Sequence, residues 1–112
     1  MNRLLGLVGL CRRAGRLALG DACAGESARA GRARALLLAQ DAGDTARRRA
    51  VRWAEEADVP LLTLPVDKAA LGRALGRASC AVAAVEDAGF ARQIEGRLTQ
   101  FQQISGGGFH GN

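Results

Sequence analysis

The chain has 112 residues and carries a formal net charge of +5. This length suffices for one domain with a buried core, and the apolar runs are too short to span a membrane. The three cysteines are scattered and form no CxxC pair, which argues against a disulfide framework and against a zinc-type metal site. We therefore expect a cytoplasmic protein of one domain that uses no metal and no cofactor.

The positive charge is concentrated in the first half of the chain. Residues 1–52 contain eleven arginines and four acidic residues, a net charge of +7, whereas residues 53–112 carry a net charge of −2. A basic segment of this kind attracts phosphate groups. The asymmetry therefore indicates a polyanionic partner.

Apolar spacing and turn residues predict helices and short strands in alternation. Leu4, Leu7 and Val8 share one face of a first helix. The uninterrupted apolar run Ala35–Ala39, bounded by turn residues, is typical of a fully buried strand. The expected elements are, in chain order, helix 2–14, strand 17–19, helix 20–30, strand 35–39, helix 44–57, strand 59–64, helix 67–76, strand 80–85 and helix 87–104.

Capping residues support three of these helices. Gly20-Asp21 offers an N-cap for the second helix, and Asp67 and Asp87 are expected to cap the last two. Alternating helices and strands predict an α/β layer fold, with helices on both faces of a sheet of about four strands. Residues 1–104 are expected to form this domain, and the glycine-rich residues 105–112 a flexible tail.

No arrangement of residues typical of catalysis is present. Gly15 and Gly20 have the spacing of a phosphate loop, but Asp21 stands where that loop needs a lysine. The only histidine is His110, in the predicted tail, and no cysteine has a histidine nearby to activate it. We therefore predict that the protein is not an enzyme and has no small-molecule substrate.

The loops that flank the predicted strands are better candidates for a binding site. They are residues 15–21, Gln40-Asp41 and residues 76–79. If these loops share one edge of the sheet, they form a patch of arginine and exposed backbone amides that suits phosphate groups. Arg47, Arg48 and Arg49 are interpreted instead as a solvated helix face, because three consecutive residues fan over about 200° of a helix.

Four blocks of sequence carry a family resemblance. They are LGLVGLCRRAGRLALGD, ARAGRARALLLAQDA, ALGRALGR and AVAAVEDAGFA. In this order they resemble the superfamily of ribosomal proteins L-seven-Ae and L-thirty-e, and most of all its bacterial YlxQ-like branch of small ribosome-associated proteins. The resemblance implies a three-layer α/β/α sandwich with a mixed four-stranded sheet. It also implies binding to structured RNA, for which the family's best-known target is the sharply bent kink-turn.

The family's RNA-binding motif is only partly retained. It reads Gly-x-Asn-Glu-x-x-Lys, and here Gly20 matches while Ala22, Cys23 and Glu26 replace the asparagine, the glutamate and the lysine. Alanine and cysteine cannot make the family's contacts to guanine edges, and Glu26 would repel phosphate. The resemblance therefore implies RNA binding through shape and phosphate groups rather than through kink-turn bases.

The resulting prediction is a non-enzymatic, ribosome-associated protein that binds ribosomal or kink-turn-like RNA. Scarce aromatic residues favour a structured RNA over an extended single strand. The alternative is a protein-interaction module of the same fold that has lost RNA binding and docks on a ribosomal or other protein. The candidate RNA-binding residues are Arg16, Gly20, Asp21, Ala22, Cys23, Gln40, Asp41, Arg77, Ala78 and Ser79.

Overall fold

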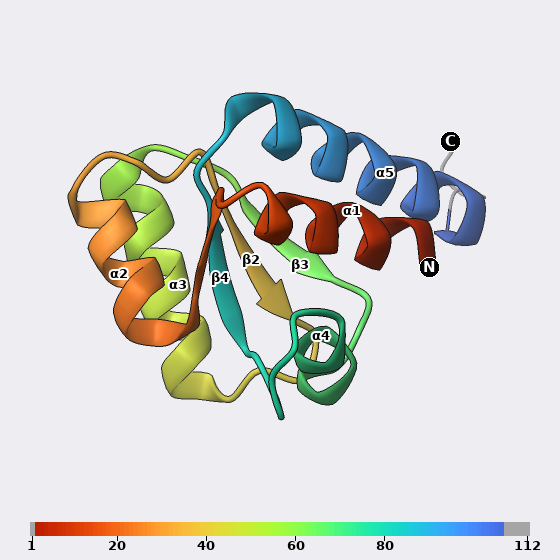
Figure 1. The fold of residues 1–112 in the computed structure, drawn as a ribbon, viewed down its shortest axis with the longest axis horizontal. Helices are drawn as coiled ribbons and strands as arrows, with labels where there is room; N and C mark the ends of the chain where they lie inside the picture. The colour runs from red at the N-terminus through yellow and green to blue at the C-terminus, as the bar shows by residue number, and fades with distance from the viewer. Residues whose placement is uncertain (1, 107–112) are drawn as a thin grey trace.

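The computed structural model describes the backbone of residues 2–106 and the side chains of residues 3–100. Helices and strands alternate as the sequence predicts (Figure 1). The elements are α1 (Asn2–Arg13), β1 (Leu17–Leu19), α2 (Gly20–Arg29), β2 (Ala35–Ala39), α3 (Asp44–Ala57), β3 (Leu61–Leu64), α4 (Lys68–Ala74), β4 (Val82–Val85) and α5 (Ala88–Gly106).

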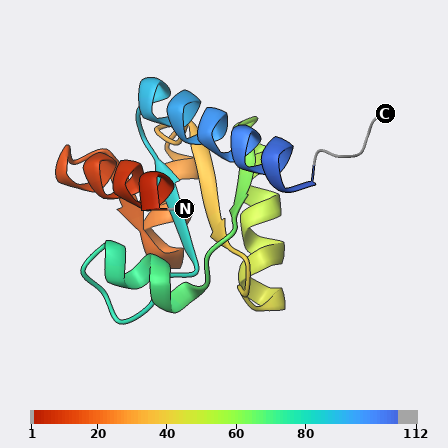
Figure 2. The same cartoon turned by 90° about the vertical axis from the view of Figure 1, so that its right-hand side faces the viewer.

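The four strands form one mixed sheet in the order β1-β4-β2-β3. Strand β2 pairs parallel with β3 and antiparallel with β4, and β4 pairs antiparallel with β1. Helices α2 and α3 cover one face of the sheet, and α1, α4 and α5 cover the other (Figures 1 and 2). The predicted three-layer α/β/α fold with a mixed four-stranded sheet is confirmed.

The two faces of the sheet have separate apolar cores, and β2 contributes to both. Leu37 packs with α1, α4 and α5, whereas Leu36 and Leu38 pack with α2 and α3 around Trp53. All five residues of β2 are buried. A strand covered on both faces has to be apolar at every position, which explains the uninterrupted run in the sequence.

Several element boundaries differ from the predicted ones. Strand β3 begins at Leu61 instead of Val59, because the Val59 amide still closes the end of α3 by donating to the Ala54 carbonyl at 3.0 Å. Strand β4 begins at Val82 instead of Cys80, whose amide donates to the Lys68 carbonyl of α4 at 3.0 Å. Helix α4 ends at Ala74, and α5 continues to Gly106.

Two of the three predicted caps are confirmed. The Asp67 carboxylate accepts a hydrogen bond from the Ala70 amide at 2.7 Å, and the Asp87 carboxylate accepts one from the Phe90 amide at 2.8 Å. The predicted Gly20-Asp21 cap is wrong, because Leu19 occupies the N-cap position of α2 and makes no side-chain hydrogen bond. No helix among residues 2–106 is long and apolar enough to cross a membrane. Of the predicted tail, residues 107–112 lie outside the described part of the chain.

Candidate nucleic-acid interface

The strand directions bring three loops to one edge of the sheet. Strands β1, β2 and β3 run in the same direction and β4 runs in the opposite one, so the carboxyl ends of the first three lie beside the amino end of β4. This edge lies at the bottom of Figure 1. Nine of the ten candidate residues are at it, and we call them the loop edge: Gly20, Asp21, Ala22, Cys23, Gln40, Asp41, Arg77, Ala78 and Ser79.

Arg16 is the exception, and its expected place beside these loops is wrong. It precedes β1, and its carbonyl accepts a hydrogen bond at 2.8 Å from the Glu86 amide, which follows the carboxyl end of β4. The three residues of β1 lie between Arg16 and Gly20, so four steps along the strand separate the two by about 13 Å. Arg16 lies at the opposite edge of the sheet.

Gly20 and Arg77 connect the first and third loops of the loop edge. Gly20 begins α2 with a φ of +86°, a conformation that residues with a side chain rarely adopt. The Nη1 atom of Arg77 lies 3.9 Å from the position that a Cβ of Gly20 would occupy. Burial raises the pKa of the neighbouring Cys80 thiol, and the Gly20 backbone and the Arg77 charge partly offset that rise.

Helix α4 fixes the position of the third loop. A Cβ on Gly72 would lie 2.5 Å from the Ser79 Cα, so only glycine lets residues 77–79 pack this closely on the helix. The Arg77 amide donates to the Gly72 carbonyl at 2.8 Å. At the other end of α4, the Asp41 carboxylate accepts a hydrogen bond from the Lys68 amide at 2.8 Å, which ties the second loop to the same helix.

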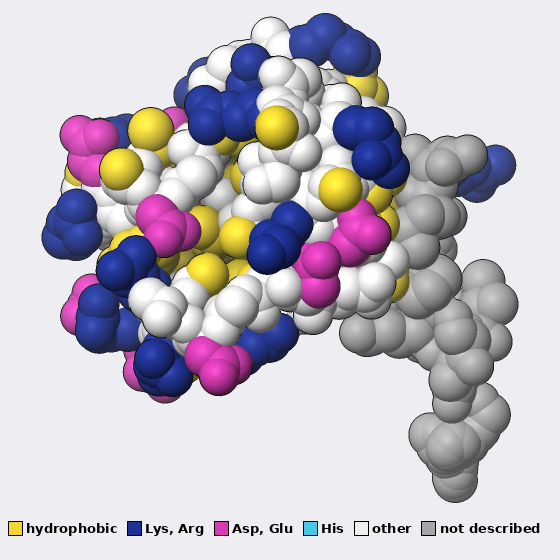
Figure 3. All heavy atoms as spheres, turned by 90° about the horizontal axis from the view of Figure 1, so that it is seen from below, with side chains coloured by type: hydrophobic (Ala, Val, Ile, Leu, Met, Phe, Trp, Pro, Cys, Tyr) yellow, Lys and Arg dark blue, Asp and Glu magenta, His cyan; other side chains and the backbone are white. Residues whose placement is uncertain are grey.

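Positive and negative side chains alternate at the loop edge, as the view from below shows (Figure 3). Asp21 is paired with Arg49 at 2.8 Å, and both side chains are nearly half exposed. Asp41 and Asp67 accept hydrogen bonds from the backbone of α4. Among the side chains of residues 3–100, the positive charge of Arg77 has no carboxylate within 4.0 Å. The surface is therefore mixed in charge, with most of its carboxylates already bound within the protein.

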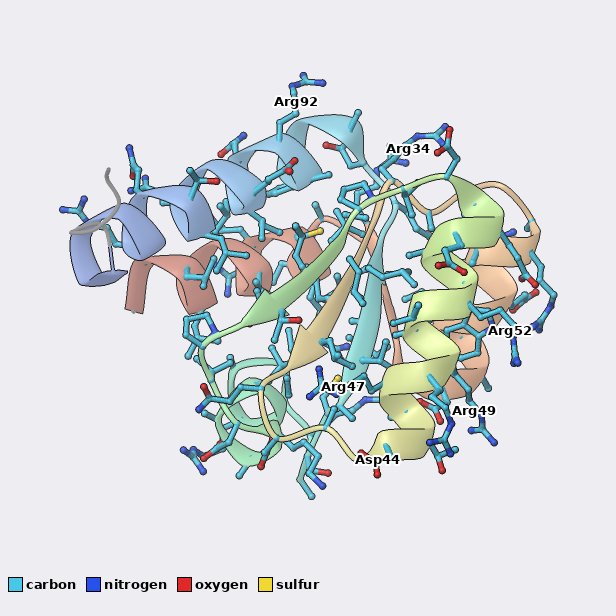
Figure 4. The ribbon with its side chains drawn as sticks, turned by 180° about the vertical axis from the view of Figure 1, so that it is seen from behind. Arg34, Asp44, Arg47, Arg49, Arg52 and Arg92 are labelled. Carbon is cyan, nitrogen blue, oxygen red and sulfur yellow. The ribbon has the colours of Figure 1, made fainter. Side chains whose placement is uncertain are left out.

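The sequence interpretation missed the contribution of α3. Arg47 donates a weak hydrogen bond of 3.5 Å to the Gln40 carbonyl, and Arg49 pairs with Asp21, so both reach residues of the loop edge. Figure 4 shows Arg47 on the side of α3 toward the strand ends, and Arg49 and Arg52 on its outer side. Arg48 and Arg49 are exposed, as the predicted solvated face requires, whereas Arg47 is partly buried. The sequence does contain a signal for this contribution: the run Arg47 to Arg49 lies in the first turns of a helix that directly follows the Gln40-Asp41 loop.

Helices α2 and α3 also enclose a shallow basic hollow next to the loop edge. Arg29, Arg49 and Arg52 line it together with Asp21, Ala22 and Trp53. Ala22 and Cys23 are exposed in the first turn of α2, and no side chain caps this helix. Small side chains and free backbone amides at a helix N-terminus allow an anion to approach closely. No cluster of metal-ligating side chains is found within the described part of the chain.

Many solved structures are similar to this chain, among them the two described below. No protein-family model matches the chain, and no curated protein matches it. A protein of unknown function from Bacillus halodurans is 26% identical, with a TM-score of 0.81 over 88% of this chain and 99% of that one. The 15.5 kD RNA-binding protein of Giardia lamblia is 24% identical, with a TM-score of 0.69 over 87% of this chain and 85% of that one.

This chain shares the fold of both proteins. The likeness extends over most of each chain, so it concerns the whole domain and not a single motif. It supports the three-layer α/β/α fold that the sequence resemblance implied.

Proposed function

We propose that the protein binds structured RNA at the loop edge and catalyses no reaction. The observation that carries this proposal is the convergence of three separate loops, with Arg77, the start of α2 and Gln40-Asp41 at one edge of the sheet. The fold shared with an RNA-binding protein of Giardia lamblia supports it. The net charge of +7 on residues 1–52 supports it as well.

In this proposal the first turn of α2 and the side chain of Arg77 bind phosphate groups. Backbone amides at the start of α2 face the partner, and the helix dipole favours negative charge there. Arg77 donates to a second phosphate from beside Gly20. The negative charge of Asp21 is paired with the positive charge of Arg49. Asp41 accepts a hydrogen bond from the neutral Lys68 amide and keeps its negative charge.

We further propose that the RNA is ribosomal or kink-turn-like and that the protein acts in the cytoplasm on the ribosome. Ala22 and Cys23 offer no strong side-chain donor or acceptor, so recognition rests on RNA shape and phosphate position. Binding of this kind is strongly salt-dependent. The logarithm of the affinity falls by roughly 0.7 to 0.9 per logarithmic unit of salt for each phosphate contact.

A matched pair of substitutions tests the proposal in a mobility-shift assay with ribosomal RNA fragments. Ala22→Glu places a carboxylate at the loop edge, where the first turn of a helix tolerates it. Ala88→Glu adds the same charge to the first turn of α5, at the opposite edge of the sheet. We expect Ala22→Glu to weaken binding about tenfold or more, and Ala88→Glu to leave it unchanged. Equal effects of the two variants, or no binding at low salt, would refute the proposal.

The mixed charge of the loop edge favours a second candidate function, docking on another protein. Asp21, Asp41 and Asp67 offset much of the positive charge there, and Ala22 and Cys23 lack the polar groups of the family's RNA motif. A complex that survives ribonuclease and is lost in Ala22→Glu would support this candidate over RNA binding. A complex that ribonuclease abolishes would exclude it.

A further inference from the structure

A groove between α1 and α5 lies on the far side of the sheet from α2 and α3. The two helices lie side by side and run in opposite directions (Figures 1 and 2). The groove is lined by Arg3, Gly6, Leu7, Leu10 and Arg13 of α1 and by Gln93 and Arg97 of α5. From Arg3 to Arg13 it extends about 15 Å, the length of about three helical turns.

The floor of this groove is apolar and open. Leu10 is 49% exposed, and the structure identifies only one other exposed large apolar side chain in its described part, Val51 with 39%. Leu7 is partly buried against the core and lies one turn from Leu10. Together Leu7 and Leu10 give the groove an apolar floor, which is the kind of surface on which the apolar face of an amphipathic helix packs.

Gly6 leaves room along the groove. Within the described part of the chain, a Cβ on Gly6 would have no atom within 4 Å among those it could meet, and the same holds for Gly96 of α5, which lines a different hollow. Glycine inside a helix is less stable than alanine there. A partner that packs closely on the groove would explain why Gly6 has no side chain.

The charged side chains at the rim of the groove are all positive. Arg3 and Arg13 stand at its two ends and Arg97 lies across from them, all exposed. Helix α1 contains no acidic residue, and Glu95 of α5 lines a different hollow, beside β3. An occupant with carboxylates about ten residues apart would complement both ends of the groove.

We propose that the α1–α5 groove binds an acidic amphipathic helix of another protein. The apolar side chains of that helix pack on Leu7 and Leu10, and its carboxylates pair with Arg3, Arg13 and Arg97. A structured RNA stacks the apolar faces of its bases on one another and presents sugar and phosphate outward, so it covers Leu10 poorly. A second copy using the same face would bring arginine against arginine. The site is separate from the loop edge and does not depend on the proposed RNA binding.

A labelled synthetic peptide of about five helical turns provides the probe, with leucine along one face and glutamate flanking it. Fluorescence anisotropy with the full chain is expected to show saturable binding. Leu10→Glu should weaken it about tenfold or more, whereas Val51→Glu, which changes the other exposed apolar residue, should have no effect. Thermal unfolding of both variants checks that they remain folded.

Charge reversal tests the role of the rim. The same peptide with lysine in place of glutamate should bind the wild-type chain about tenfold more weakly or worse, and should bind the Arg3→Glu/Arg13→Glu variant in preference. Absence of acidic-peptide binding, or equal binding to Leu10→Glu, would overturn the proposal. So would a Leu10-dependent affinity for ribosomal RNA, or for vesicles of phosphatidylcholine and phosphatidylglycerol in equal parts. Ala22→Glu should leave peptide binding unchanged, which separates this result from the test of RNA binding.

Discussion

Replacing Gly72 by alanine tests how α4 positions the loop edge. The added Cβ would lie 2.5 Å from the Ser79 Cα, 2.7 Å from its amide nitrogen and 2.9 Å from its carbonyl carbon. All three are backbone atoms, so no side-chain rotation relieves the overlap. Residues 77–79 must therefore move away from the helix, and the Arg77 guanidinium moves with them.

The expected change in stability combines two opposing effects. Overpacking of a closely packed contact costs about 1–3 kcal/mol. Alanine in place of a helical glycine contributes about 0.5–1 kcal/mol in the other direction. Because the overlap is with backbone atoms, as close as 2.5 Å, the cost lies in the upper part of this range, about 2–3 kcal/mol. We therefore expect Gly72→Ala to lower the free energy of unfolding by about 1–2.5 kcal/mol. Gly96→Ala serves as the control, because a Cβ there would have no described atom within 4 Å. It tests the preference of a helix for alanine alone and should raise the free energy of unfolding by about 0.5–1 kcal/mol.

Urea unfolding followed by Trp53 fluorescence measures both variants. Trp53 is the only tryptophan and is 6% exposed, so its emission reports the loss of the core around it. The reasoning is refuted if Gly72→Ala is as stable as the wild-type chain. The same variant should also bind RNA more weakly than Gly96→Ala does, because only Gly72→Ala displaces Arg77.

Three further outcomes follow from named contacts. Asp67→Ala removes the cap that accepts from the Ala70 amide and should cost about 1 kcal/mol in the free energy of unfolding, measured in urea. Of the three cysteines, only the exposed Cys23 should react with a thiol reagent in the folded protein; Cys11 and Cys80 are buried and should react on unfolding. Burial, with smaller contributions from the Asp87 and Glu86 carboxylates, raises the pKa of Cys11 from 9.0 to about 11. The unfolded thiol therefore ionises first, and the free energy of unfolding should fall as pH rises from 9 toward 11, with a shallower slope in Cys11→Ala.

The sequence predicted elements well where local signals and burial agree. The run Ala35–Ala39 and the helix Asp44–Ala57 have the predicted bounds, because turn residues flank a strand that is buried on both faces. Prediction failed at the start of β3, where the end of the preceding helix decided the boundary. Val59 has a strand-forming side chain, but Asp58 before it adopts a φ of +57° and the Val59 amide closes α3.

The loops of the candidate site could be predicted from the sequence, but the pairing of its charged side chains could not. Strand order depends on pairing between residues far apart in the sequence, so a shared edge for the three loops could only be assumed from the sequence. For the same reason Arg16 was placed at the wrong edge of the sheet. The Gly72–Ser79 approach and the Arg49–Asp21 pair depend on how α4 and α3 pack, which no local pattern encodes. For the same reason the arginine run of α3 was interpreted as solvated, although Arg47 and Arg49 reach the loop edge.

The central claim is that the loop edge is the surface that meets RNA. Ultraviolet crosslinking in living cells, followed by mass spectrometry of the nucleotide-bearing peptides and sequencing of the attached RNA, tests it most directly. The account predicts nucleotide adducts within residues 20–23, 40–41 and 77–79, with Cys23 a favourable site because it is exposed in the first turn of α2. Adducts confined to α1 and α5, or an absence of attached RNA, would contradict it.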